Sequence, residues 1–195
     1  TFNVTAVCIP EEHYMVRLDD RLREIKNLID AGKYFSINRA RQFGKSTVLL
    51  ALEQYLQRDY RVVLLDFQTF DEVKFQNGSV FAAAFAKSFL RALQRDRRNE
   101  EFGKATAHLE KRMEENGFAL MELFEELSDI CAVSDRPVVL MIDEVDSATD
   151  NQVFLDFLAQ LRAYYIRRTL QRTFRSVILA GVCDVKNFRR KIRPE

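Results

Sequence analysis

The sequence predicts an α/β protein in which helices cover both faces of a mainly parallel sheet. Three observations lead to this prediction. Four short apolar runs, typical of buried strands, occur at 33–38, 61–67, 137–142 and 176–182. The segments between them carry apolar residues at helical spacing, as the crossover connections of parallel strands do. Polar or acidic residues follow directly after the later runs, where sheets of this kind bind ligands.

Size and composition fit one globular domain over 1–195, with 47% hydrophobic and 30% charged residues. We divide it into an N-terminal linker and helix at 1–32 and an αβα core at 33–195. The net charge of +1 gives no global reason to expect nucleic acid or an acidic membrane. Because the chain begins without methionine and stops soon after a strand, we expect a fragment of a longer protein.

Cysteine usage and hydropathy indicate a cytoplasmic protein. Cys8, Cys131 and Cys183 are too few and too scattered for a disulfide framework or a zinc site. No apolar run approaches the ~20 residues that span a bilayer, and no secretory leader is visible.

The first half of the chain predicts three helices and two strands. Helix 19–30 ends at a Gly32 C-cap and precedes strand 33–38, and the next helix runs from Lys45 to about Asp59. The first of these helices places Leu22, Ile25, Leu28 and Ile29 on one face, and the second places Val48, Leu49, Leu52, Tyr55 and Leu56 on one face. Strand 61–67 is apolar on both faces, which predicts a central position, and Ser79 is expected to cap a helix reaching about Arg95.

The second half predicts two more strands among helices. The charge-rich segment 94–117 is expected to be a solvated helix or a mobile connection, since its alternating signs argue against a nucleic-acid surface. Helix 118–133 precedes strand 137–142, and helix 152–170 precedes strand 176–182. The aromatic residues of helix 152–170 are interpreted as core. The basic end at 189–193 is interpreted as solvated.

Gly44-Lys45-Ser46 is a candidate phosphate-binding turn, because it joins a predicted strand to a predicted helix. Glycine allows close approach to a phosphate, and the first N–H groups of the helix point at an anion. Lys45 would reach the β- and γ-phosphates, and the Ser46 hydroxyl would ligate magnesium. The pattern G-x-x-x-x-G-K-[ST] asks for glycine where this chain has Arg39, so the entrance of the loop is expected to differ.

Asp143 and Glu144 come directly after five consecutive apolar residues. Acids at the end of a buried strand need compensation, which magnesium, phosphates and an ordered water would provide. Together with the Gly-Lys-Ser turn, they predict binding of a nucleoside triphosphate. Asp184, after the last strand, would either sense phosphate and position water or cap a following helix.

The sequence resembles the bacterial AAA-like ATPase-domain proteins, a branch of the P-loop NTPases near the archaeal-type and STAND ATPases. The resemblance lies in 35–47, 139–146 and 176–185 and covers essentially the whole chain. An arginine at the position of Arg39 is common in that family. The resemblance implies a three-layer αβα P-loop NTPase of the AAA/ASCE kind with strand order 5-1-4-3-2. The fifth strand would follow residue 195, which leaves strand 33–38 at an edge.

The resemblance also implies site residues. Lys45 and Ser46 would be the Walker A lysine and the magnesium ligand, Asp143 the Walker B carboxylate that acts on magnesium, and Glu144 the residue that polarises the attacking water. Asp184 would be sensor 1 and would join Glu144 and Lys45 as a catalytic residue. The expected nucleotide-binding residues are Arg39, Ala40, Arg41, Gln42, Phe43, Gly44, Lys45, Ser46, Thr47, His13 and Tyr14. An interpretation in which His13 and Tyr14 pack the first helix against the sheet stays open.

The implied function is hydrolysis of Mg-ATP to ADP and phosphate, slow in the isolated domain, with nucleotide state coupled to conformation or to a partner. A nucleotide-regulated switch or scaffold without meaningful hydrolysis and a DNA-associated ATPase remain alternatives, and a small-molecule kinase is disfavoured by Glu144. The expected partners are ATP, Mg²⁺ and either further copies of the chain or another protein, without a membrane. Arg39, Arg41, Arg189, Arg190 and Arg193 are candidates for an arginine finger, and no nuclease activity is expected.

Overall fold

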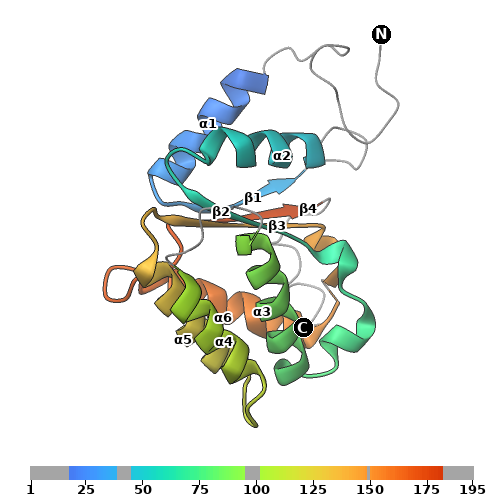
Figure 1. The fold of residues 1–195 in the computed structure, drawn as a ribbon. Coiled ribbons are helices and arrows are strands. Elements are labelled where there is room, and N and C mark those ends of the chain that lie inside the picture. Colours follow the sequence, from blue (N-terminus) through green and yellow to red (C-terminus); the bar gives the residue numbers. More distant parts are fainter. Residues whose placement is uncertain (1–17, 39–44, 95–101, 149, 182–195) are drawn as a thin grey trace.

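The fold has three layers, with a four-stranded sheet between two groups of helices (Figure 1). The computed structural model describes residues 18–38, 45–94, 102–148 and 150–181. Helices α1 (Leu18–Asp30) and α2 (Lys45–Leu56) cover one face of the sheet. The other face carries α3 (Gly78–Gln94), α4 (Gly103–Met113), α5 (Leu120–Val133) and α6 (Gln152–Ile166). The predicted αβα class is confirmed.

The strands are β1 (Tyr34–Asn38), β2 (Arg61–Asp66), β3 (Val138–Asp143) and β4 (Ser176–Gly181). All neighbouring pairs are parallel, and the order in the sheet is β1-β4-β3-β2. These four strands follow the 1-4-3-2 part of the expected order, and the expected fifth strand has no counterpart among the described residues. The connections include the short 3₁₀ helices η1 (Phe67–Thr69), η2 (Glu72–Phe75) and η4 (Val145–Ala148).

The prediction that strand 61–67 is central was wrong, because β2 forms an edge of the described sheet. Along β2, buried Val63 and Leu65 alternate with half-buried Val62 and Leu64. The central positions belong to β3 and β4, whose residues are all buried. A run of apolar residues does not separate these two situations, because a half-buried face of an edge strand is also apolar.

The sheet separates two hydrophobic clusters of unequal size. Of the residues that the structure describes, 13 buried ones form the cluster between the sheet and α1/α2, among them Leu49 and Leu52. The cluster on the α3–α6 face has 33 buried members among the described residues and contains most of the buried aromatic side chains, which pack around Phe81 and Phe157. The interpretation of the aromatic residues of α6 as core is therefore confirmed for Phe154, Phe157 and Tyr165.

Two helix ends show how the sequence fixes local structure. Gly32, at φ +62°, ends α1 as predicted, and the Gly32 N–H to Ile29 O and Lys33 N–H to Leu28 O bonds form a Schellman motif. The predicted cap of α3 was wrong. Asn77, not Ser79, accepts a hydrogen bond from the Val80 N–H at 2.9 Å through its side chain, so the helix begins two residues earlier.

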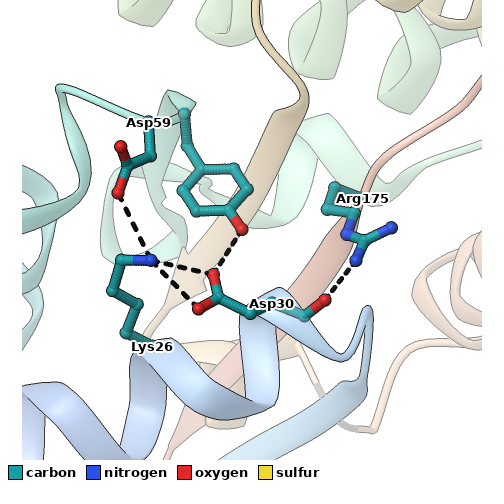
Figure 2. A network of polar contacts seen from close by, with 5 residues as sticks. Lys26, Asp30, Asp59 and Arg175 are labelled. Atoms are coloured by element: carbon teal, nitrogen blue, oxygen red, sulfur yellow. Dashed lines mark hydrogen bonds and ion pairs between the residues drawn. The ribbon is translucent and has the colours of Figure 1, made fainter.

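A polar network fastens α1 to the amino ends of β2 and β4 (Figure 2). Lys26 lies 3.0 Å from Asp30 and 3.3 Å from Asp59, the Tyr60 hydroxyl donates to the Asp30 carboxylate, and Arg175 donates to the Asp30 backbone carbonyl. The bond from Tyr60, followed by Lys26, lowers the pKa of the Asp30 carboxyl, and the bond to Asp30 raises the pKa of Lys26. The network therefore lies at the amino ends of the strands, on the side of the sheet opposite to the candidate site.

Within the described ranges, no helix has the length and apolar character that crossing a membrane requires.

Candidate functional site

The carboxyl ends of the four strands form one edge of the sheet. Asn38 of β1 lies opposite Gly181 of β4, and Asp66 of β2 lies opposite Asp143 of β3. In Figure 1 the arrows of β1 and β4 point to the side on which α2 begins. Because β4 separates β1 from β3, the ends of these two strands are two strand spacings apart, roughly 10 Å. The edge therefore brings the start of α2 and the acids after β3 into one region.

Helix α2 offers its first N–H groups at this edge. It begins at Lys45, and its first turn contains no acidic residue that would use the partial positive charge of the helix end. The backbone of Lys45, Ser46 and Thr47 is helical, which is the arrangement expected of a phosphate-binding turn. The described structure does not extend to the side chains of these three residues, so their predicted contacts stay predictions.

Asp143 ends β3 as a buried carboxylate, with 7% of the residue exposed. Its Oδ1 accepts a hydrogen bond from the backbone N–H of Glu144 at 2.8 Å. A buried carboxylate needs hydrogen bonds or a cation, and the sheet edge places it where an oxygen-seeking cation would be accessible. Asp143 therefore has the position and the donor chemistry expected of the predicted magnesium residue.

Glu144 has an unusual backbone conformation. At φ +56° it is the one non-glycine residue with positive φ among those described. This left-handed conformation is unfavourable for a side chain with a Cβ, and strained residues of this kind gather at functional sites. The turn ends β3 and begins η4, so the half-buried Glu144 leaves the line of the strand. Of the two adjacent acids, Asp143 thus belongs to the strand and Glu144 belongs to the turn that follows it.

Asp146 lies against the end of β4, a placement that the sequence did not reveal. A Cβ built on Gly181 would lie 2.8 and 2.9 Å from the Asp146 carboxylate oxygens and 2.9 Å from Val145 Cγ2. The absence of a side chain at Gly181 thus lets the acid-rich turn pack directly on the neighbouring strand. The sequence shows an acid three residues after Asp143 and a glycine at the end of the last strand. These two residues are distant in the sequence and come together only in the folded structure.

Asp66 is a further acid at this edge among the described residues, and its side chain stabilises the local turn. Its Oδ1 accepts a hydrogen bond from the Gln68 N–H at 2.8 Å, and the side chain caps η1. This bond explains the polar residue at the end of β2 without a ligand.

Several predicted site residues lie outside the described residues. They are His13, Tyr14, Arg39, Ala40, Arg41, Gln42, Phe43, Gly44 and Asp184. Of the predicted site, the structure thus brings together the start of α2, Asp143 and Glu144. The roles assigned to all of these residues remain predictions.

Comparisons with known proteins agree with this architecture. A family model described as an AAA-like domain matches residues 4–185. No curated protein matches the sequence significantly.

Two solved structures share the fold at low sequence identity. The ORC2 protein of Aeropyrum pernix, solved as ADPNP–ADP complexes, is 12% identical, with a TM-score of 0.54 over 92% of this chain. A Walker-type ATPase of Pyrococcus abyssi, paby2304, is 16% identical, with a TM-score of 0.56 over 92% of this chain. The chain spans less than half of either protein, 44% and 48% respectively.

Proposed function

Because the chain belongs to the AAA-like domain family, we propose that it binds Mg-ATP at the carboxyl edge of the sheet and hydrolyses it to ADP and phosphate. The observation that carries the proposal is the pair of adjacent acids at the end of β3, where Asp143 is the buried last residue of the strand and Glu144 follows it at φ +56°. For this hydrolysis, one carboxylate would bind the cation and the other would orient the attacking water.

In the proposed mechanism, the N–H groups of the first turn of α2 and Lys45 hold the β- and γ-phosphates. Asp143 and Ser46 would supply oxygen atoms for magnesium, in keeping with the preference of this ion for hard oxygen ligands. Bound magnesium would neutralise charge that develops on the phosphate oxygens.

Glu144 would accept a proton from the attacking water. The water oxygen forms a bond to the γ-phosphorus while the bond between that phosphorus and the β–γ bridging oxygen breaks, and ADP leaves with the electron pair. The hydrogen bond from the Glu144 N–H to Asp143 Oδ1 connects the two acids. It would keep the orientation of Glu144 tied to that of the magnesium residue.

The test is phosphate release from Mg-ATP by the purified chain, together with ATP binding, for the wild type, Lys45→Ala and Glu144→Gln. We expect Lys45→Ala to lose binding and Glu144→Gln to retain binding while turnover falls by ~10²-fold or more. Glu125→Gln, an exposed glutamate on α5, is the matched control and is expected to keep full activity.

The outcomes separate the alternatives. Binding without turnover in the wild type would overturn hydrolysis in favour of a nucleotide-regulated switch. Turnover that Glu144→Gln leaves unchanged would overturn the role of Glu144. Absence of nucleotide binding would overturn the proposed function as a whole.

A further inference from the structure

The stretch between Asp156 and Asp184 has an unusual charge pattern. It contains five arginines, no lysine and no acidic residue, although the whole chain is almost neutral at +1. The arginines are Arg162, Arg167, Arg168, Arg172 and Arg175, on the end of α6 and on the connection to β4. Positive charge is therefore concentrated in one region of a nearly neutral molecule.

Three of these side chains are held in place by uncharged groups. Arg168 lies 4.2 Å from the centre of the Tyr165 ring and donates to the Tyr165 carbonyl at 3.2 Å. Arg172 donates to the Ala132 carbonyl at the end of α5 at 3.1 Å, and Arg175 donates to the Asp30 carbonyl (Figure 2). A Cβ built on Gly32 would lie 3.7 Å from the guanidinium groups of both Arg168 and Arg175, so both groups border Gly32.

The positive charge of the five arginines is balanced only in part, because Arg175 is one of the groups that lower the pKa of the Asp30 carboxyl. None of them forms an ion pair with a carboxylate among the described residues. The nearby Asp30 carboxylate is occupied by Lys26 and Tyr60, and Asp135 is paired with Arg61 and Arg136. The ends of α5 and α6 contribute only about half a negative charge each. A site for an anionic partner remains.

Exposed apolar side chains lie among the arginines. Leu170 is 88% exposed and Ile166 is 63% exposed, and Val133, next to the carbonyl that holds Arg172, is 50% exposed. We call the five arginines together with Ile166 and Leu170 the arginine surface. Arginines together with exposed apolar residues are typical of protein interfaces, whereas a phosphate backbone would leave Leu170 in water.

We propose that the arginine surface binds an acidic protein segment that also carries apolar side chains. The forked guanidinium groups match carboxylates in a bidentate manner, and Ile166 and Leu170 would be buried against the apolar side chains of the partner. This proposal does not depend on ATP hydrolysis. Its test is run without nucleotide, so either can fail alone.

The experiment measures fluorescence anisotropy of a labelled peptide of about 18 residues, with leucines spaced four apart among glutamates. We expect saturable binding to the 195-residue chain that weakens as salt is raised. A matched peptide with glutamine in place of every glutamate is expected not to bind.

Charge reversal tests the location. Arg162 and Arg167 make no side-chain hydrogen bond or ion pair with another described residue, so Arg162→Glu/Arg167→Glu is expected to fold normally and to weaken binding at least about tenfold. Leu170→Ser is expected to weaken binding by about tenfold as well. Arg91→Glu, an exposed arginine in the last turn of α3, is the control and is expected to bind as the wild type does.

Three results would overturn the proposal. The first is the absence of saturable binding of the acidic peptide. The second is an equal loss of peptide affinity in Arg91→Glu and in the double variant. The third is tighter binding of duplex DNA than of the peptide, with a DNA affinity that Leu170→Ser does not change. The last result would assign the surface to nucleic acid. Thermal melting of each variant shows whether a loss of binding reflects a loss of folding.

Discussion

At the scale of single residues, Glu144 illustrates a conflict between folding and chemistry. Its φ of +56° costs a residue with a Cβ roughly 1–2 kcal/mol, which glycine would avoid. Glycine would also remove the carboxylate that the proposed hydrolysis needs. A role of the Glu144 carboxylate in the proposed hydrolysis would explain why a strained glutamate, and not glycine, occupies this position.

Glu144→Gly is accordingly expected to unfold at higher urea concentration than Glu144→Gln, with a free energy of unfolding higher by about 0.5–1 kcal/mol. Both variants are expected to lack turnover, since neither retains the carboxylate. Equilibrium unfolding followed by circular dichroism gives the comparison. A glycine variant that is less stable than the glutamine variant would show that the backbone is not strained here.

Sequence reasoning located the residue but not its conformation. The abrupt change from apolar residues to Asp143 and Glu144 predicted acids at the end of a strand. The turn after Glu144 packs against β4, where Asp146 lies close to Gly181, and the sequence around Glu144 does not reveal this contact between distant residues.

At the scale of elements, the network in Figure 2 joins three pieces that are distant in sequence. Asp30 ends α1, Tyr60 precedes β2, and Arg175 precedes β4. The pKa of Asp30 is lowered, chiefly by the hydrogen bond from Tyr60. The charged form of Asp30 is thus favoured by folding.

This lowered pKa fixes the sign of a pH dependence. Asp30→Asn is expected to destabilise the protein at pH 7, because the charged form of Asp30 binds Lys26 and Tyr60 there. The difference between wild type and variant is expected to shrink as the pH falls below the ordinary aspartate pKa of 3.8 and through the lower pKa of the folded state. Urea unfolding of both proteins at pH 7 and near pH 3 measures it.

An exposed acid on the same helix provides the comparison. Asp19→Asn, at the first turn of α1, removes a charge without this network. A difference for Asp30→Asn that stays constant across the pH range would contradict the linkage.

The elements themselves were largely predictable. Four apolar runs gave the four strands, and periodicity gave the long helices. Two predictions were wrong. The position of β2 at an edge depends on the order of all four strands, which the apolar character of one strand does not determine. The cap of α3 is Asn77, because its side chain accepts the hydrogen bond from the Val80 N–H. The arginine surface was not predicted, because Arg168 and Arg175 both come to border Gly32 only in the folded structure.

At the scale of the whole molecule, the α3–α6 face depends on interlocked aromatic rings. The Phe157 ring lies 4.8 Å from that of Phe85, 5.1 Å from that of Phe81 and 5.6 Å from that of Phe124, measured between ring centres. It is fully buried, so no relaxation toward solvent can compensate for its removal.

Phe157→Ala is expected to lower the free energy of unfolding by about 3–5 kcal/mol, and Phe157→Leu by clearly less, because leucine leaves a smaller cavity. Urea unfolding gives both values. Val73→Ala, at a side chain that is 59% exposed, is expected to change stability by less than about 0.5 kcal/mol. Similar losses for Phe157→Ala and Val73→Ala would contradict the importance of this cluster.

The unequal clusters on the two faces of the sheet have a consequence for local opening. Among the described residues, the cluster beneath helices α1 and α2 has 13 buried members, whereas the cluster of the opposite layer has 33. Local stability follows the amount of buried contact, so amide hydrogens of α1 and α2 are expected to exchange with deuterium sooner than those of α3, α5 and α6. Helix α2, whose first turn lies at the candidate phosphate site, is therefore expected to open locally more readily than the helices of the opposite layer. A ligand that grips its first turn would slow exchange mainly in that layer.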